Sequence, residues 1–190
     1  MAECCVGFAV TGSFCTFRPV FEQMQMLAGH GFRVIPIMSE NAYTTDTRFG
    51  RAADWIARAQ EITGENVIHT IAQAEPIGPK KLLDLLIIAP CTGNTLGKLA
   101  AGIYDTAPTL AVKSHRRNGR PVLIAVSTND ALAASAPAIA MLENRKGIYF
   151  VPYEQDDFGG KPCSCVADFT QILPAAQAAM EGRQLQPILL

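Results

Sequence analysis

Five short runs of apolar residues constrain the fold of this chain more than any other feature of its sequence. Each run is apolar at successive positions instead of alternating with polar residues, so both faces of each strand must be covered. The runs lie at residues 4–10, 33–38, 84–90, 121–127 and 147–152. Segments with helical periodicity separate them. Strands and helices that alternate in this way predict right-handed crossovers and a parallel sheet with helices on both faces.

Six helices are expected between and after these strands. They lie at residues 17–29, 49–62, 94–103, 106–117, 130–144 and 166–181. The expected fold class is α/β, with a doubly wound parallel sheet in a three-layer, Rossmann-like arrangement. Two long connections, residues 63–81 and 153–165, are interpreted as lids, oligomer contacts or solvated surface turns.

Composition limits the classes of protein to which the chain can belong. Of its 190 residues 49% are apolar, enough for the core of a single domain spanning residues 1–190. The 16 lysines and arginines are balanced by 17 acidic residues, so no basic field attracts nucleic acid or a membrane surface. Without a signal-like segment or an apolar run of about 18 residues, the sequence predicts a cytoplasmic protein. Its six cysteines form no CxxC pair and its three histidines share no zinc spacing with them, which predicts no metal site.

Small polar residues follow four of the predicted strands. They are Thr11, Gly12, Ser13, Ser39, Thr92, Asn94, Thr95, Ser127, Thr128 and Asn129. Because the carboxyl ends of parallel strands meet at one edge of a sheet, these residues are expected to lie together. Helix N-termini offer free N–H groups and a partial positive charge there, so the pattern predicts a cradle for an anionic group that contains no lysine. The alternative is that they only cap helices, but a cap needs one polar residue and most of these junctions supply more.

Several nucleotide-binding and catalytic motifs are absent from the sequence. No GxGxxG follows the first strand, no GxxxxGK[ST] is present, and no GxSxG occurs. These absences disfavour a dinucleotide fold, a P-loop nucleotidase and a hydrolase of the nucleophile-elbow type. A mononucleotide such as FMN, with one phosphate and a flat ring, fits the polar junctions better than NAD or ATP.

Longer stretches carry a resemblance to a known family. They read "TGSFCTF", "DTRFGRAADW", "AEPIGPKK", "IAPCTGNTLGKLA", "RNGRPVLIAVSTNDAL", "YEQDD" and "QLQPIL", and they are spread over nearly the whole chain. They resemble the flavoprotein family that includes the cysteine decarboxylases of coenzyme A and lantibiotic synthesis and the flavin prenyltransferases. In that family the turn that here contains Asn94 and Thr95 helps bind FMN, so the resemblance implies FMN at the ten polar junction residues. It also implies homo-oligomers, with trimers or dodecamers as the suggested forms.

Within this family the resemblance is to subunits that act in making dipicolinic acid, the pyridine dicarboxylate of bacterial endospores. It implies an oxidoreductase subunit in the mother-cell cytoplasm of a sporulating bacterium. The implied substrate is a small dicarboxylate, a dihydrodipicolinate-type precursor. The implied partner is an A subunit that carries the nicotinamide cofactor, NAD(P), which agrees with the absence of a dinucleotide motif here. No catalytic residue is assigned.

The sequence departs from the decarboxylases of this family at two places. Their catalytic histidine lies near the helix that here reads "RFGRAADWIARAQ", which contains none, and His69 in the following loop is not equated with it. Their Pro-Ala-Met-Asn turn is replaced here by residues 127–130, in which Asp130 adds a negative charge. Two alternatives follow: a non-catalytic subunit that keeps the fold and holds FMN, product or partner, and a free-standing flavin-dependent decarboxylase, which the missing histidine disfavours.

Charged residues outside the junctions allow two interpretations. Arg48, Lys98 and the basic segment 113–120 are candidates for binding the carboxylates of a substrate. The alternative for Arg48 is a surface salt bridge, and for the segment 113–120 a solvated helix end, where cations are favoured. Asp105 is predicted to cap the helix that follows it.

Overall fold

A central parallel sheet forms the middle layer of the computed structural model, which describes residues 4–190. Its parallel strands are β1 (Cys5–Val10), β2 (Arg33–Met38), β3 (Leu85–Cys91), β4 (Val122–Thr128) and β5 (Ile148–Phe150). These strands lie within one or two residues of the five apolar runs, so the predicted strands are confirmed. β3 is buried along its whole length because strands flank it on both sides and helices cover both of its faces.

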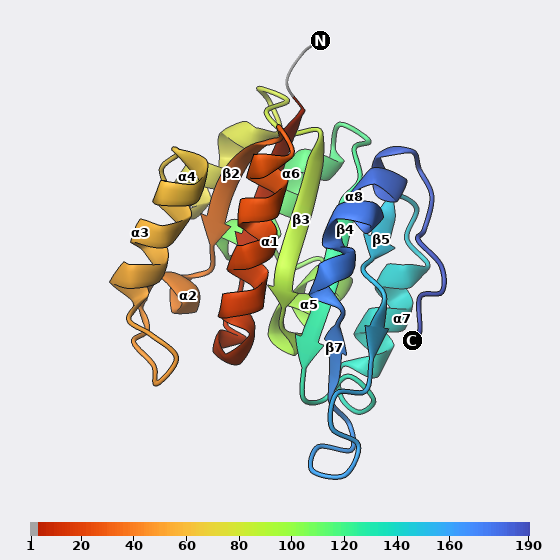
Figure 1. The fold of residues 1–190 in the computed structure, drawn as a ribbon. Coiled ribbons are helices and arrows are strands. Elements are labelled where there is room, and N and C mark those ends of the chain that lie inside the picture. Colours follow the sequence, from red (N-terminus) through yellow and green to blue (C-terminus); the bar gives the residue numbers. More distant parts are fainter. Residues whose placement is uncertain (1–3) are drawn as a thin grey trace.

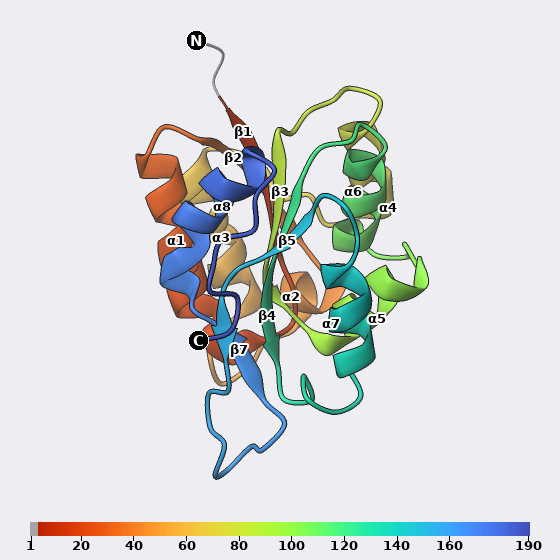
Figure 2. The same cartoon turned by 90° about the vertical axis from the view of Figure 1, so that its right-hand side faces the viewer.

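Helices cover both faces of this sheet, as Figures 1 and 2 show. On one face lie α1 (Phe17–Gly29), α3 (Ala52–Thr63) and α8 (Ile172–Met180). On the other lie α4 (Ile71–Ala74), α5 (Gly93–Ala101), α6 (Ala107–Arg116) and α7 (Ala136–Glu143). The short helix α2 (Glu40–Thr44) follows β2 directly, and 3₁₀ turns occupy Phe14–Thr16, Glu75–Ile77 and Phe169–Gln171. The three-layer α/β class predicted from the sequence is confirmed.

The core lies between the sheet and the two helical layers. On the α1 face, Phe17 and Phe21 pack against the ring of Trp55 on α3, with ring centroids 5.4 and 4.8 Å apart. On the other face, α5 contributes Leu96 and Leu99, which are almost completely buried. These contacts hold the two helical layers against the sheet.

Two short antiparallel strands, which the sequence did not predict, extend the parallel sheet. β7 (Cys165–Ala167) pairs with the last two residues of β4, through Ser127 with Val166 and Thr128 with Cys165. β6 (Tyr153–Glu154) pairs with β7 in turn. The helix predicted from residue 166 therefore begins only at Ile172. A strand of three residues owes its pairing to distant partners, which local periodicity does not reveal.

Two further expectations on local structure were wrong. The helix predicted over 130–144 starts at Ala136, because residues 130–135 form turns held by Asp130. The connection 63–81 is not wholly loop. It contains α4, whose N-cap is Thr70 with a capping box completed by Gln73.

The end of the chain packs along one border of the sheet. The side-chain amide of Gln184 accepts a hydrogen bond from Phe150 N at 2.8 Å and donates one to Phe150 O at 2.7 Å. Further on, Tyr153 N donates to Ile188 O and Leu190 N donates to Tyr153 O. These bonds pair backbone groups of β5 and β6 at this border. Within residues 4–190 no helix is long and apolar enough to cross a membrane.

Candidate functional site

A cavity of about 520 Å³ opens at the carboxyl ends of β1, β3 and β4. It lies between the N-terminus of α5 and the segment that connects β6 to β7. Its lining residues are Gly12, Ser13, Phe14, Cys15, Phe49, Thr92, Gly93, Asn94, Ser127, Thr128, Asn129, Asp130, Asp156, Lys161, Ser164 and Val166. Its volume falls within the range of about 300–1,000 Å³ typical of small-molecule and cofactor sites.

Thr11 lies beneath the cavity and connects the turn after β1 to the turn after β3. Its Oγ1 donates a hydrogen bond to Pro90 O at 2.7 Å and accepts one from Thr92 N at 3.1 Å. The side chain is 1% exposed, so Thr11 does not line the cavity. It instead holds the start of α5 against the end of β1.

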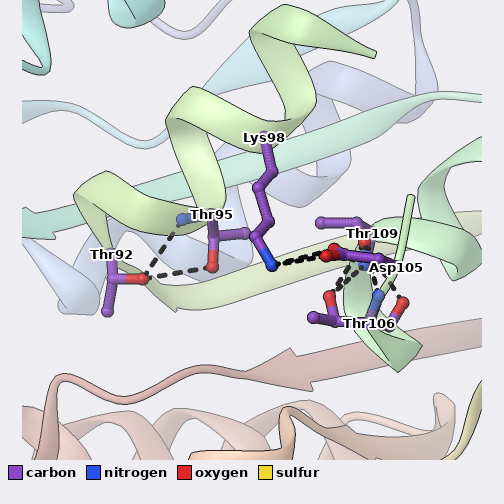
Figure 3. Close-up of polar contacts among 6 residues, drawn as sticks. All are labelled: Thr92, Thr95, Lys98, Asp105, Thr106 and Thr109. Carbon is purple, nitrogen blue, oxygen red and sulfur yellow. Dashed lines mark hydrogen bonds and ion pairs between the residues drawn. The ribbon is translucent and has the colours of Figure 1, made fainter. Parts of the chain in front are cut away.

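The N-terminus of α5 faces the cavity with Gly93 and Asn94. Thr92 is the N-cap, and its Oγ1 accepts a hydrogen bond from Thr95 N at 3.4 Å and lies 3.1 Å from Thr95 Oγ1 (Figure 3). Thr95 is nearly buried in this turn. The first N–H groups of a helix have no intrahelical acceptor, so this end of α5 can donate hydrogen bonds to an anion in the cavity.

The end of β4 supplies the opposite wall through residues 127–130. Ser127 Oγ lies 2.8 Å from Ser13 Oγ, and this contact connects the end of β4 to the turn after β1. Asp130 Oδ1 accepts hydrogen bonds from the hydroxyls of Thr128 and Ser135. A Cβ on Gly93 would come within 2.7 Å of Asp130 Oδ1, so only glycine lets α5 approach this turn so closely.

Most of the predicted site residues come together in this one cavity. Those that line it are Gly12, Ser13, Thr92, Asn94, Ser127, Thr128 and Asn129. Thr11 and Thr95 lie behind its wall. Ser39 does not line it either, because its Oγ accepts a hydrogen bond from Ala42 N at 3.3 Å as the N-cap of α2. Their roles toward a cofactor stay a prediction.

Several lining residues were not among those predicted. Asp156, Lys161 and Ser164 come from the connection 155–164, which the pairing of β7 with β4 brings to the cavity. The long polar connection was itself a signal, since a lid was one of its interpretations. Phe49 adds an apolar surface, and its ring lies 4.8 Å from the guanidinium carbon of the neighbouring Arg48.

A second cavity, of about 370 Å³, lies beside α2 and α4. Its wall includes the stacked rings of Tyr43 and His69, whose centroids are 3.8 Å apart. Asp105 also lines it, and this residue does not cap α6 as predicted. Thr106 is the N-cap of α6, whereas Asp105 accepts hydrogen bonds from Lys98 Nζ at 2.8 and 3.0 Å (Figure 3). The hydrogen bond from Lys98 lowers the pKa of Asp105.

The basic segment lies at the amino ends of β3, β4 and β5, far along the strands from the first cavity. We call His115, Arg116, Arg120 and Arg145 the basic cluster. Arg116 donates hydrogen bonds to the carbonyls of residues 120, 146 and 147, Arg120 to those of residues 81 and 83, and Arg145 to those of residues 99 and 100. Arg120 also pairs with Asp84 at 3.2 Å. Lys113 and Arg117 of the basic segment are exposed, as expected of a solvated helix end. The guanidinium groups of Arg116, Arg120 and Arg145, by contrast, bind carbonyls of the chain itself and so are engaged without a substrate carboxylate.

His115 is 1% exposed, and its Nε2 lies 2.9 Å from Pro121 O. Burial lowers the pKa of His115 to about 4, and the charges of Arg120 and Arg116 act in the same direction.

The described part of the chain contains no disulfide and no cluster of side chains suited to a metal ion. Among residues 4–190 no group of three or more His, Cys, Asp or Glu side chains is placed to hold a metal ion. All six cysteines are free, and burial raises the pKa of the Cys91 thiol. The carboxyl edge offers backbone amides, hydroxyls and side-chain amides, which are neutral groups able to donate hydrogen bonds to a ligand.

Comparisons with known proteins agree with this geometry. Residues 2–167 match the family model described as Flavoprotein. The B subunit of dipicolinate synthase from Bacillus subtilis is 42% identical over 185 residues, which cover 97% of this chain and 92% of that protein. The crystal structure of the corresponding B subunit from Bacillus halodurans is 41% identical and superposes with a TM-score of 0.91, covering 100% of this chain and 97% of the other. The FMN-dependent cysteine decarboxylase SpaF, 21% identical, superposes with a TM-score of 0.71 over 95% of this chain and 98% of its own. At that identity the likeness concerns the fold alone.

Proposed function

The chain belongs to the flavoprotein family, and on that premise we propose that it binds FMN and acts as the B subunit of a dipicolinate synthase. Its partner is the A subunit, which binds NAD(P). Together they form dipicolinic acid from a dihydrodipicolinate-type precursor in the mother-cell cytoplasm of a sporulating bacterium. The observation that carries the proposal is the convergence of three polar strand-to-helix junctions in one cavity.

The residues of the cavity fit a mononucleotide. A phosphate would be held by the backbone N–H groups of Gly93 and Asn94 and by the hydroxyl of Ser13. These groups are neutral hydrogen-bond donors, and two of them lie at the N-terminus of a helix. Phe14 and Phe49 offer apolar contact for a flat ring. Gly12 would let the ligand approach the backbone closely, since nothing but hydrogen projects from its Cα. When bound, FMN supplies a ring able to exchange a hydride or electrons with a substrate.

Two measurements test this function. Titration of the purified protein with FMN should change the visible flavin spectrum with a single site per chain. A mixture of the protein with the A subunit, NAD(P) and precursor should form dipicolinate faster than the same mixture without this protein. An A subunit that is fully active without this chain would contradict the catalytic part of the proposal.

A matched pair of variants links the spectrum to the cavity. Asn94→Ala keeps the backbone N–H but removes the side-chain amide, which we expect to make one hydrogen bond to the ligand, so it should weaken FMN binding by roughly threefold to tenfold. Asn144→Ala, on the far end of α7, should leave the affinity unchanged.

A second candidate function is a subunit that keeps the fold and the partner but binds no flavin. The observation in its favour is that Asp130 and Asp156 both line the cavity, where their carboxylates would repel a phosphate. It predicts no spectral change with FMN, together with a stable complex with the A subunit. A flavin-dependent decarboxylase is not favoured, and release of carbon dioxide from a peptidyl-cysteine would be needed to support it.

A further inference from the structure

The connection between β6 and β7 places one cation at the first cavity. Among the described residues that line it, the charged side chains are those of Asp130, Asp156 and Lys161. Within this lining, a single side chain is therefore able to form an ion pair with an anionic substrate. The other donors toward an anion are neutral.

The ammonium of Lys161 has a weak ion-pair partner in Asp156. Its Nζ lies 3.3 Å from Asp156 Oδ2, and the Lys161 side chain is 55% exposed. Burial acts to raise the pKa of Asp156, but hydrogen bonds from Ser164 and Lys161 and the lysine charge lower it overall, so the carboxylate stays ionised. Exposed ion pairs of this kind are weak, because water and dissolved ions screen the two charges. A better placed anion can therefore displace Asp156.

The backbone around Lys161 is fixed more firmly than its side chain. Gln155 Nε2 donates to Pro162 O at 2.6 Å, and Leu132 N donates to Cys163 O at 3.0 Å, which anchors the connection to the turn after β4. Lys161 N itself donates to the backbone carbonyl of residue 157 at 2.7 Å. The Cα of Lys161 is thus held at the rim, while its flexible four-carbon stem can carry the ammonium into the cavity.

We propose that Lys161 binds a carboxylate of a small dicarboxylate in this cavity, and that Asp156 holds the ammonium while the cavity lacks that ligand. This inference rests on the proposed function, because it assigns the substrate class to the same site. The phosphate of FMN is an alternative anion for Lys161. The N-terminus of α5 already offers the phosphate its donors, which leaves the lysine for the second ligand.

Calorimetry with the FMN-loaded protein tests the assignment, with dipicolinate as the probe. Lys161→Ala should weaken dipicolinate binding about tenfold or more, the loss of one charge-assisted contact, whereas Lys161→Arg should retain most of the affinity. Asp156→Asn should strengthen binding about twofold to fivefold, because the competing carboxylate is gone. Picolinate, which has one carboxylate, should lose less than dipicolinate when Lys161 is replaced.

Controls separate this proposal from its alternatives. FMN titration of the Lys161→Ala apoprotein should give the wild-type affinity, and its thermal unfolding should match wild type. Unchanged dipicolinate affinity in Lys161→Ala, or no dipicolinate binding by the wild type, overturns the inference. If Lys161→Ala loses affinity for FMN, Lys161 binds the phosphate of FMN, and this result also overturns the inference. If the A subunit proves fully active alone while Lys161→Ala still weakens dipicolinate binding, the proposed function fails and this inference stands.

Discussion

Polar side chains at the two ends of the sheet differ in what they bind. At the carboxyl ends they are mostly small and neutral, and several present donors to an open cavity. At the amino ends the basic cluster is rich in charge, yet its guanidinium groups donate to backbone carbonyls. The comparison teaches that a dense run of cations in a sequence need not mark a binding site. A carbonyl at the end of a helix or before a strand is itself an anion-like acceptor that arginine can satisfy.

The comparison predicts that substitutions in the basic cluster change stability and not binding. The largest effect is expected at His115 under acid conditions. Its pKa is about 4 in the folded protein, below the ordinary value of 6.5. The contribution of neutral His115 to the free energy of unfolding is therefore fully present above pH 6.5. It is lost as the pH falls toward 4, because the unfolded chain binds the proton at a higher pH than the folded protein does. The loss between pH 7 and pH 4 should be about 3 kcal/mol from this residue.

Urea unfolding of the wild type and of His115→Gln at both pH values measures that contribution. The variant keeps an N–H donor for Pro121 O but does not titrate, so its stability should fall by about 3 kcal/mol less than that of the wild type. Equal acid sensitivity in the two proteins would show that His115 is not buried in its neutral form.

Arg145→Ala should produce the next largest effect. It removes two hydrogen bonds to the last carbonyls of α5, at Leu99 and Ala100, and should lower the free energy of unfolding by about 2–3 kcal/mol at neutral pH. The FMN affinity of the folded variant should stay at the wild-type value. Arg51→Ala is the control, because its ion pair with Asp54 is exposed and contributes little. A drop in flavin affinity without a drop in stability would contradict the view that the basic cluster serves stability and not binding.

Gly12→Val tests the opposite end of the sheet. A Cβ at Gly12 would lie 3.7 Å from its nearest neighbours, in Asn41 and Phe14, so the fold should tolerate a side chain. The added methyl groups should obstruct the cavity and weaken FMN binding by about 1–3 kcal/mol. Equilibrium titration and thermal unfolding measure the two quantities. Gly29→Val on α1, where a Cβ meets nothing within 4 Å, is the matched control and should bind FMN normally.

The smallest effect is expected for Lys98→Ala. Lys98 pairs with Asp105, which is more than half exposed, so the variant should lose little stability and no flavin affinity. Differential scanning calorimetry measures the change in stability. A clear loss of flavin binding would contradict this expectation and would mean that Lys98 contributes to the site at the carboxyl ends of the strands.

The sequence predicts the layers and the rim better than it predicts the walls of the cavity. Apolar runs of five or more residues identify the long strands, and α1 begins and ends where its periodicity predicts. Thr92 and Asn94 follow from their position after β3. Lys161 and Ser164 do not, because they reach the cavity only through the pairing of Val166 with Ser127, a contact between residues far apart in the chain.

Asp105 and His115 were misread for a related reason. Each has a residue type that suits its local position, a cap or a solvated helix end, and each takes its actual partner from an element whose position depends on the complete fold.

The borders of the sheet limit how this molecule can meet another. Ile68 covers the carboxyl end of β2 through hydrogen bonds with Met38 and Pro36, and the last residues of the chain cover β5 and β6 through Gln184, Ile188 and Leu190. Within residues 4–190, little main chain at these borders is left for strand addition by a neighbour. We therefore expect copies of this protein, or a different subunit, to associate through helical faces and loops. Such contacts depend on the identity of individual side chains, so single surface substitutions should be able to separate the assembly without unfolding its members.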